Sequence, residues 1–251
     1  MLLKMRSLLI LIFVLIFSSP VYSQVPDSTR QIVLVITGDA DAQEGTITFF
    51  EREEKQPWEK VGISGPIMVG RTGLANGLGL HNTEDITLPD KVEGDGKSPA
   101  GIFSLSNVFA FDSADGSPEM PFIRVAEALE CVDDSKSEYY TQIVNSDSVD
   151  KVDWNSSEMM YETTPYYLQG IVAEHNTNAV PGRGSCIFLH YWKTPGEATA
   201  GCTAMKPDLL NQIIQQLDSK KNPALVQLTD EDYKRLKEKW ELPEYPRLTA
   251  E

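Results

Sequence analysis

Short apolar runs recur along the chain and predict a structure made mostly of strands. Residues 32–37 form a β-branched run that is typical of a buried strand, and residues 46–51 alternate between apolar and polar positions. Gly- and Pro-rich stretches, notably 70–79 and 93–101, separate the runs. Further strands are expected at residues 58–63, 67–69, 102–105, 122–125, 166–173, 186–192 and 224–228.

Two segments carry a helical pattern. Residues 207–217 place leucine and isoleucine side chains on one stripe, with Pro207 at the tolerated first turn. Thr229 and Asp232 resemble a capping box with Asp in place of Glu, and they open a charged helix that we expect to reach Trp240. Many short strands with few helices predict a mainly β (α+β) domain with helical additions.

The N-terminus has the three parts of a secretory signal. Lys4 and Arg6 precede an apolar run at residues 8–17, and residues 21–23 offer small side chains at the cleavage positions. A membrane anchor is the alternative, but spanning the bilayer takes about 20 apolar residues. We therefore expect a signal peptide at 1–23, a short polar lead-in at 24–30 and a single domain at 31–251. The protein is expected to be exported to the periplasm or cell envelope, with no membrane span after signal removal.

Charge narrows the range of partners. The chain has a formal net charge of −15, and it becomes more acidic once the two basic residues of the signal are removed. A strongly negative net charge repels nucleic acid and anionic lipid surfaces, so we expect no nucleic-acid partner. The simplest use of the acidic residues is solubility.

The chain has three cysteines, Cys131, Cys186 and Cys202. In an oxidising compartment an odd number leaves at least one thiol unpaired, or paired between chains. A bridge between Cys131 and Cys186 would leave Cys202 free, but spacing alone does not select that pairing.

The sequence contains few motifs that would indicate catalysis by a group other than a cysteine. The sequence contains no nucleotide-binding glycine loop, no H-E-x-x-H, no C-x-x-C and no G-x-S-x-G, and its three histidines are scattered. We therefore expect neither a metal nor an organic cofactor. The remaining candidate is the segment from His190, in an apolar strand, to Gly201 and Cys202.

A thiol next to an imidazole can perform acyl transfer. A thiol of pKa about 8.5 is only a few per cent thiolate at neutral pH, so it needs a base. The imidazole of His190 would accept the proton of Cys202 and later return it to the leaving amine, through a thioester. Backbone amides around Gly201 and Cys202 are candidates for an oxyanion hole. The alternative is a buried cysteine that packs as a small hydrophobe, beside a structural histidine.

Two blocks of sequence carry a family signature. One contains Phe188-Leu-His190, a short loop, and residues 199–205, TAGCTAM; the other contains Val69-Gly-Arg71 followed by residues 91–103, KVEGDGKSPAGIF. Together they resemble the L,D-transpeptidase catalytic-domain (YkuD-like) family over roughly residues 66–217. The family signature is a strand histidine, a short loop and Ser/Thr-x-Gly-Cys.

The resemblance implies a fold, a site and a substrate. The fold is a mixed β-sandwich with a few peripheral helices, which holds the cysteine and histidine in a groove. The implied site has Cys202 as nucleophile, His190 as base, Gly201 before the nucleophile, and Thr199 as the hydroxyl residue that shapes the catalytic turn. The implied reaction is peptidoglycan cross-linking: the thiol attacks the carbonyl before a terminal D-residue of a stem peptide, releases D-alanine and passes the acyl group to a neighbouring amine.

Three further residues are candidates for substrate binding. Arg71 suits a bidentate contact with a substrate carboxylate, although an ion pair with an acidic side chain is the simpler role. Trp192 is a candidate for the groove wall, with packing as its alternative. His175 is a candidate for the groove, with a structural role as its alternative.

Two departures leave other functions open. Ala204 stands where many family members carry Arg or Asn, and residues 106–165 are not explained by the common core. One alternative is an L,D-carboxypeptidase, in which water is the acceptor. The other is a cell-wall-binding module that kept the fold and lost turnover.

Overall fold

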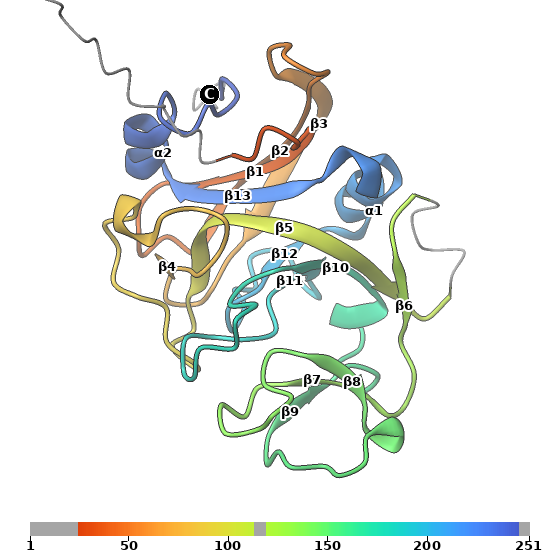
Figure 1. Ribbon diagram of the computed structural model, residues 1–251. Helices are drawn as coiled ribbons and strands as arrows, with labels where there is room; N and C mark the ends of the chain where they lie inside the picture. The colour runs from red at the N-terminus through yellow and green to blue at the C-terminus, as the bar shows by residue number, and fades with distance from the viewer. Residues whose placement is uncertain (1–24, 113–118, 246–251) are drawn as a thin grey trace, which may run out of the picture.

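The computed structural model describes residues 25–112 and 119–245, and a mixed sheet dominates it (Figure 1). The predicted signal peptide at 1–23 lies outside the described residues. The sheet follows the order β10-β11-β12-β3-β2-β1-β13-β5-β4, with β6 paired to β5. Its strands are β1 (Gln31–Thr37), β2 (Glu44–Glu51), β3 (Glu59–Met68), β4 (Leu74–Asn76), β5 (Ser98–Ala110), β6 (Phe122–Arg124), β10 (Gln169–Ala173), β11 (Phe188–Tyr191), β12 (Thr203–Met205) and β13 (Ala224–Thr229).

The long strand β5 joins two layers of this sheet. Its residues 101–104 pair with β13, and its residues 105–110 pair with β10. Figure 1 shows β1, β13 and β5 lying over β10, β11 and β12. The predicted fold class, a mainly β structure with a mixed sheet and few helices, is confirmed.

The hydrophobic core lies against β1. All seven residues of β1 are buried, between β2 on one side and β13 on the other. Helix α1 (Pro207–Gln216) buries its apolar stripe in the same cluster and confirms the predicted helix. The core is therefore built where the sequence has its longest apolar runs.

Helix α2 (Asp230–Leu236) begins as the sequence predicts. The side chain of Thr229 accepts a hydrogen bond from the amide of Asp232 at 3.0 Å, which satisfies one of the unpaired amides of the first turn. The helix ends four residues before the predicted end at Trp240. The indole of Trp240 is buried and donates to Asp85 at 3.0 Å, and the chain leaves the helix in turns that carry it there.

Four predicted strands have different bounds in the structure. The strands predicted at 58–63 and 67–69 are merged in the single strand β3, which begins at Glu59 and ends at Met68. Residues 166–168 form the 3-10 helix η4 (Tyr166–Leu168) rather than the start of β10, because the amide of Leu168 bonds back to the carbonyl of Pro165. The strand predicted at 186–192 starts only at Phe188, since Cys186 has a left-handed φ of 53° that breaks the alternation.

Residues 106–165, which the sequence left unexplained, supply the end of β5, β6 and a second sheet. This sheet has the order β8-β7-β9 and lies at the bottom of Figure 1. A disulfide between Cys131 on β7 and Cys186 ties it to the segment that leads into β11. The strands are β7 (Leu129–Val132), β8 (Ile143–Asn145) and β9 (Ser157–Met159), and we call this three-stranded unit, residues 129–159, the insertion. The remaining 3-10 turns are η1 (Thr83–Asp85), η3 (Ser146–Ser148) and η5 (Ser219–Lys221).

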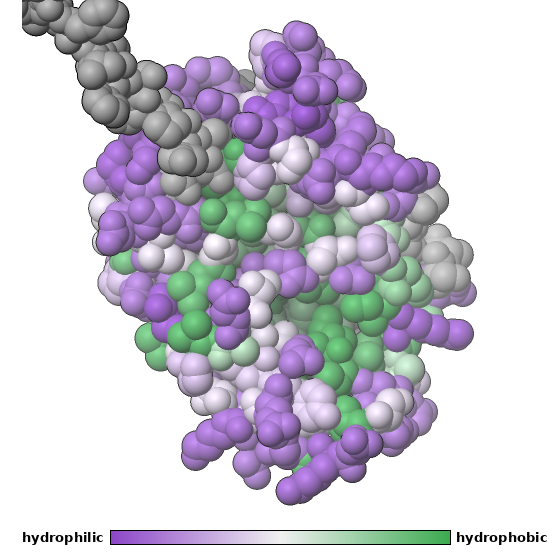
Figure 2. Space-filling model, in the orientation of Figure 1, coloured by the Kyte–Doolittle hydropathy of each residue, from purple (hydrophilic) through white to green (hydrophobic). Residues whose placement is uncertain are grey.

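The surface visible in Figure 2 is largely hydrophilic. Figure 2 shows polar and charged residues over most of one face, with smaller apolar patches between them. Within residues 25–112 and 119–245, no helix is long and apolar enough to cross a membrane.

Candidate active site

The free thiol of Cys202 lies beside the strand that carries His190. Strand β11 pairs in parallel with β12, and His190 stands opposite Ala204, two residues after the cysteine. The amide of Phe188 donates to the Cys202 sulfur at 3.3 Å, and the thiol contacts the carbonyl of Cys186 at 3.4 Å. The sulfur is therefore held against the backbone that leads into the histidine strand.

The disulfide pattern resolves the pairing that the sequence left open. Cys131 and Cys186 are bonded to each other, and Cys202 is a free cysteine that is only 6 % exposed. The chain thus keeps one thiol, at the position expected for the nucleophile.

Thr199 shapes the turn before this thiol. Its hydroxyl donates to the carbonyl of Cys202 at 2.6 Å and accepts from the amide of Gly201 at 3.1 Å. Ser98 donates to the same Cys202 carbonyl at 2.8 Å. Because the Gly201 amide is already bound to Thr199, it is not free for the oxyanion hole that the sequence suggested.

His190 is buried in the wall of the site. Its Nδ1 lies 2.8 Å from the carbonyl of Tyr191, so Nδ1 carries the proton and Nε2 is the acceptor. Burial lowers the pKa of His190 to about 4, and the hydrogen bond to Tyr191 only partly offsets this. The imidazole is therefore neutral at pH 7. Within the described part of the chain, no hydrogen bond joins His190 to Cys202.

A pocket of about 410 Å³ lies over this turn. Cys202 is not itself a lining residue, but its sequence neighbours Ala200 and Ala204 are. His190, on β11, and Trp192, which follows that strand, also line the pocket. Glu158 brings a carboxylate from the insertion. The other lining residues are Ser157, Met159, Thr163, Tyr166, Tyr167, Glu197, Ala198 and Thr199.

Two residues that the sequence did not single out reach the thiol from this side. The hydroxyl of Tyr167 donates to the Glu158 carboxylate. It also acts on Cys202, since a hydrogen bond from Tyr167 is one of the contributions that lower the pKa of the thiol. Burial raises the pKa of Glu158 to about 7; the Tyr167 hydroxyl lowers it, and the charges of Asp133 and Glu93 raise it further. No periodic pattern or motif marks these residues, because each reaches the site only through the folded insertion and η4.

A buried cation flanks the same turn. Lys91 is only 3 % exposed, and its Nζ lies 2.6 Å from Asp95. A Cβ built on Gly201 would lie 3.9 Å from this Nζ, which places the ammonium beside the nucleophile turn. Lys91 is the first residue of the family-like block at 91–103. Its place in that block was the only indication in the sequence that it lies near the site.

The pKa of Cys202 records the balance of these neighbours. Burial raises it, and the charge of Glu158 raises it further. The Phe188 amide, Tyr167 and Lys91 all lower it. The thiol is therefore protonated at rest, and its activation requires a proton acceptor.

The three predicted substrate-binding residues lie in different places. Trp192 lines the pocket. Arg71 is exposed beside the nucleophile turn, where its amide donates to the carbonyl of Thr199 at 2.8 Å, and its side chain lies over Gly96. His175 is buried, and backbone groups of Leu78 and Arg183 bind its two ring nitrogens at 3.2 and 2.8 Å. These contacts favour the structural alternative for His175, and substrate binding by Arg71 and His175 stays a prediction.

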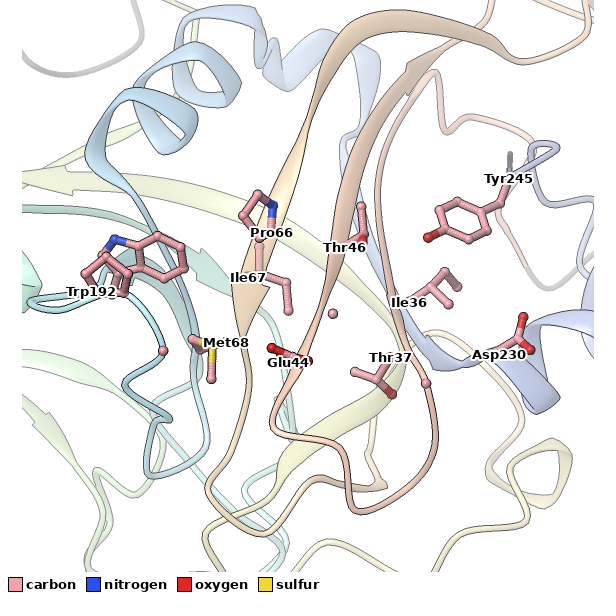
Figure 3. Close-up of a pocket in the computed structure, with 14 residues that line it drawn as sticks. Ile36, Thr37, Glu44, Thr46, Pro66, Ile67, Met68, Trp192, Asp230 and Tyr245 are labelled. Atoms are coloured by element: carbon pink, nitrogen blue, oxygen red, sulfur yellow. The ribbon is translucent and has the colours of Figure 1, made fainter. Parts of the chain in front are cut away.

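Trp192 also belongs to a second hollow, of about 640 Å³ (Figure 3). In Figure 3 it lies at one side, strands β1, β2 and β3 cross the middle, and Tyr245 and Asp230 lie at the other side. The Trp192 side chain thus stands between two adjoining depressions of the surface.

One of three comparisons with known proteins identifies the family of the chain. The model of the L,D-transpeptidase catalytic domain matches residues 37–226, which include the two signature blocks and every residue around the thiol. No curated protein and no solved structure matches the chain significantly. Because the match covers well over half of the chain, the protein belongs to the L,D-transpeptidase catalytic-domain family.

Proposed function

We propose that this protein is a peptidoglycan L,D-transpeptidase that uses Cys202 as its nucleophile. The observation that carries the proposal is the state of the three cysteines. Cys131 and Cys186 are consumed in a disulfide, whereas Cys202 is free in the turn under a pocket lined by an imidazole. In the family to which the chain belongs, that position fits a covalent acyl carrier.

The reaction follows from the groups around the pocket. The thiolate of Cys202 attacks the carbonyl carbon before the terminal D-residue of a stem peptide, and the C–N bond breaks to give a thioester and free D-alanine. An amine of a second stem then attacks the thioester, forms the new amide and releases the thiol. His190, neutral at pH 7 and facing the pocket with Nε2 as acceptor, serves as acid and base in these steps.

The charge of the pocket supports an amine as the acceptor. Glu158 and Glu197 both line it, while Lys91 is held in an ion pair with Asp95 and is not among its lining residues. Carboxylates attract a cationic amine and give no such preference to water. This favours transpeptidation over hydrolysis, and it leaves L,D-carboxypeptidase activity as the second candidate.

Two features support work outside the cytoplasm. A disulfide persists in oxidising compartments and is rare in the cytosol. The sequence of residues 1–23 also has the pattern of a signal peptide. We therefore place the activity in the periplasm or cell envelope.

Purified tetrapeptide muropeptides test the proposal. We expect cross-linked dimers with the wild-type protein and none with Cys202→Ala, and circular dichroism of both proteins shows whether the variant is folded. Tripeptide monomers in place of dimers would identify a carboxypeptidase. Unchanged substrate, together with no covalent carbapenem adduct by intact mass, would identify a wall-binding module.

A further inference from the structure

Three side chains from separate parts of the fold form a chain that ends on the thiol. The Tyr167 hydroxyl donates to the Glu158 carboxylate, and a hydrogen bond from Tyr167 is one of the contributions that lower the pKa of the Cys202 thiol. Tyr167 is buried on η4, and Glu158 lies on β9 of the insertion. A carboxylate, a hydroxyl and a thiol thus follow one another as neighbours.

The fold holds Glu158 in place through the disulfide. Glu158 stands directly opposite Cys131 in the β7–β9 pairing, so the two side chains leave the same face. Cys131 is bonded to Cys186, whose carbonyl contacts the Cys202 thiol at 3.4 Å. The covalent bridge therefore connects the strand of the carboxylate to the backbone that touches the sulfur.

We propose that Tyr167 and Glu158 form a proton relay that activates the Cys202 thiol. At rest the thiol donates to the carbonyl of Cys186, so the S–H group first turns to the Tyr167 oxygen. The S–H bond then breaks and leaves its electron pair on sulfur. The proton passes to the Tyr167 oxygen while the phenolic proton passes to Glu158, so tyrosine ends as it began. The products are a thiolate and a neutral carboxylic acid, with no change in total charge.

The surroundings favour this exchange. The charge of Glu158 is one cause of the raised pKa of Cys202, and that repulsion disappears when Glu158 takes the proton. The Phe188 amide and the Lys91 ammonium remain to stabilise the thiolate. Tyr167 keeps its own proton at rest, because its pKa lies well above the usual value, chiefly through burial.

His190 is a weaker acceptor for this proton than Glu158. Burial lowers the pKa of His190 to about 4 and raises that of Glu158 to about 7. The charged groups that act on Glu158 are Asp133 and Glu93, which raise its pKa. The relay therefore takes the thiol proton and leaves His190 free to act on the substrate amine.

The relay rests on the proposed function for its purpose, but its test needs no peptidoglycan. Iodoacetamide alkylates a thiolate, and the only free cysteine is Cys202, so the rate of mass gain from pH 4 to 9 reports thiol activation. Below the pKa of Glu158 the carboxylic acid cannot accept a proton. We expect the wild-type rate to rise with a midpoint near pH 7.

Two variants separate a relay from a purely electrostatic effect. Glu158→Gln removes a negative charge, and charge alone would lower the pKa of Cys202 and speed alkylation. The relay predicts the opposite: the rate at pH 7 falls by about 100-fold and the rise near pH 7 disappears. Tyr167→Phe, which keeps the ring and removes the hydroxyl, is expected to give the same loss, and the double variant to lose no more than either single one.

Glu197→Gln is the matched control. Glu197 lines the same pocket and accepts from Tyr166 at 2.8 Å, so this variant removes a similar charge outside the relay. It is expected to keep the midpoint near pH 7. Faster alkylation of Glu158→Gln, an unchanged rate in Tyr167→Phe, a wild-type midpoint near pH 4, or no alkylation of wild type at any pH would each overturn the relay. A muropeptide assay that fails while these profiles hold would instead overturn the proposed substrate.

Discussion

The main sheet and the insertion are stabilised in different ways. In the main sheet, β1 is buried along its whole length and belongs to a large apolar cluster. The insertion has strands of three or four residues, and Glu130 accepts hydrogen bonds from Trp154 and Ser157 at 2.9 and 2.5 Å. The main sheet thus depends on apolar burial, and the insertion on a polar network and a disulfide.

The two regions also contribute different residues to the candidate site. The main sheet places His190 in the wall of the pocket and pairs its strand with the strand that follows Cys202. The insertion adds Glu158 to that pocket, and the disulfide fixes its position. In the proposed mechanism, the family fold supplies the nucleophile Cys202, and the insertion supplies the carboxylate of Glu158.

The largest expected effect is a loss of stability from truncating the main core. Leu34 on β1 is fully buried, whereas Leu129 on β7 is 8 % exposed and belongs to a smaller cluster. Leu34→Ala should lower the free energy of unfolding by roughly 3–5 kcal/mol, because it leaves a cavity in a region that cannot collapse around it. Leu129→Ala should cost only about 2 kcal/mol. Urea denaturation measures both.

For thiol reactivity we expect the opposite ranking of these two alanine variants. Leu129→Ala loosens the sheet that holds Glu158, so it should change the pH profile of Cys202 alkylation more than Leu34→Ala does.

Leu34→Met, which conserves volume, is the control for the stability measurement and should lower the free energy of unfolding by less than about 1.5 kcal/mol. Equal losses of stability from the two alanine variants would show that the regions are packed alike.

The next largest effect comes from removing the disulfide. Cys131→Ala combined with Cys186→Ala releases a loop closed across 55 residues, and it should lower the free energy of unfolding by about 2–4 kcal/mol. Exposure of Glu158 to water should also lower its pKa from about 7 towards the ordinary carboxyl value, since burial is the main cause of the rise. Glu158 would then be ionised already at a lower pH, but its carboxylate would no longer be held against the Tyr167 hydroxyl.

We therefore expect this double variant to alkylate slowly at pH 7 although Cys202 is unchanged. Thermal unfolding and the alkylation rate are the two measurements. Wild type treated with a reductant, and then with the reductant removed in air, is the matched control and should regain both properties. A variant that loses stability but alkylates at the wild-type rate would show that the disulfide supports the fold and leaves the site alone.

Local patterns explain which parts of the fold the sequence predicted. β1 and α1 have long apolar patterns, and the Thr229 cap depends on residues three apart, so each was readable from neighbouring residues. β7, β8 and β9 are too short to show a period. The Tyr166–Leu168 run has the composition of a strand, yet the bond from the Leu168 amide to the Pro165 carbonyl turns it into η4.

The candidate site divides in the same way. Cys202, His190, Gly201 and Thr199 lie within one motif, so their roles followed from the family resemblance. Glu158 and Tyr167 reach the thiol through the β7–β9 pairing and the 3-10 turn, and no spacing in the sequence encodes that approach. The pairing of Cys131 with Cys186 likewise needs the folded chain.

The smallest effect serves as the control that separates stability from chemistry. Thr229 caps α2 at the end of β13, where its hydroxyl oxygen accepts from the Asp232 amide at 3.0 Å. Thr229→Ala leaves that buried amide unpaired and should lower the free energy of unfolding by about 1 kcal/mol, while Thr229→Ser keeps the oxygen and should cost only a few tenths. Urea denaturation measures the loss. Since the cap lies in the main sheet region and outside the Glu158–Tyr167–Cys202 chain, neither variant should move the midpoint of alkylation from near pH 7. A shift of that midpoint in Thr229→Ala would mean that thiol reactivity follows global stability, and the distinction between the two regions would fail.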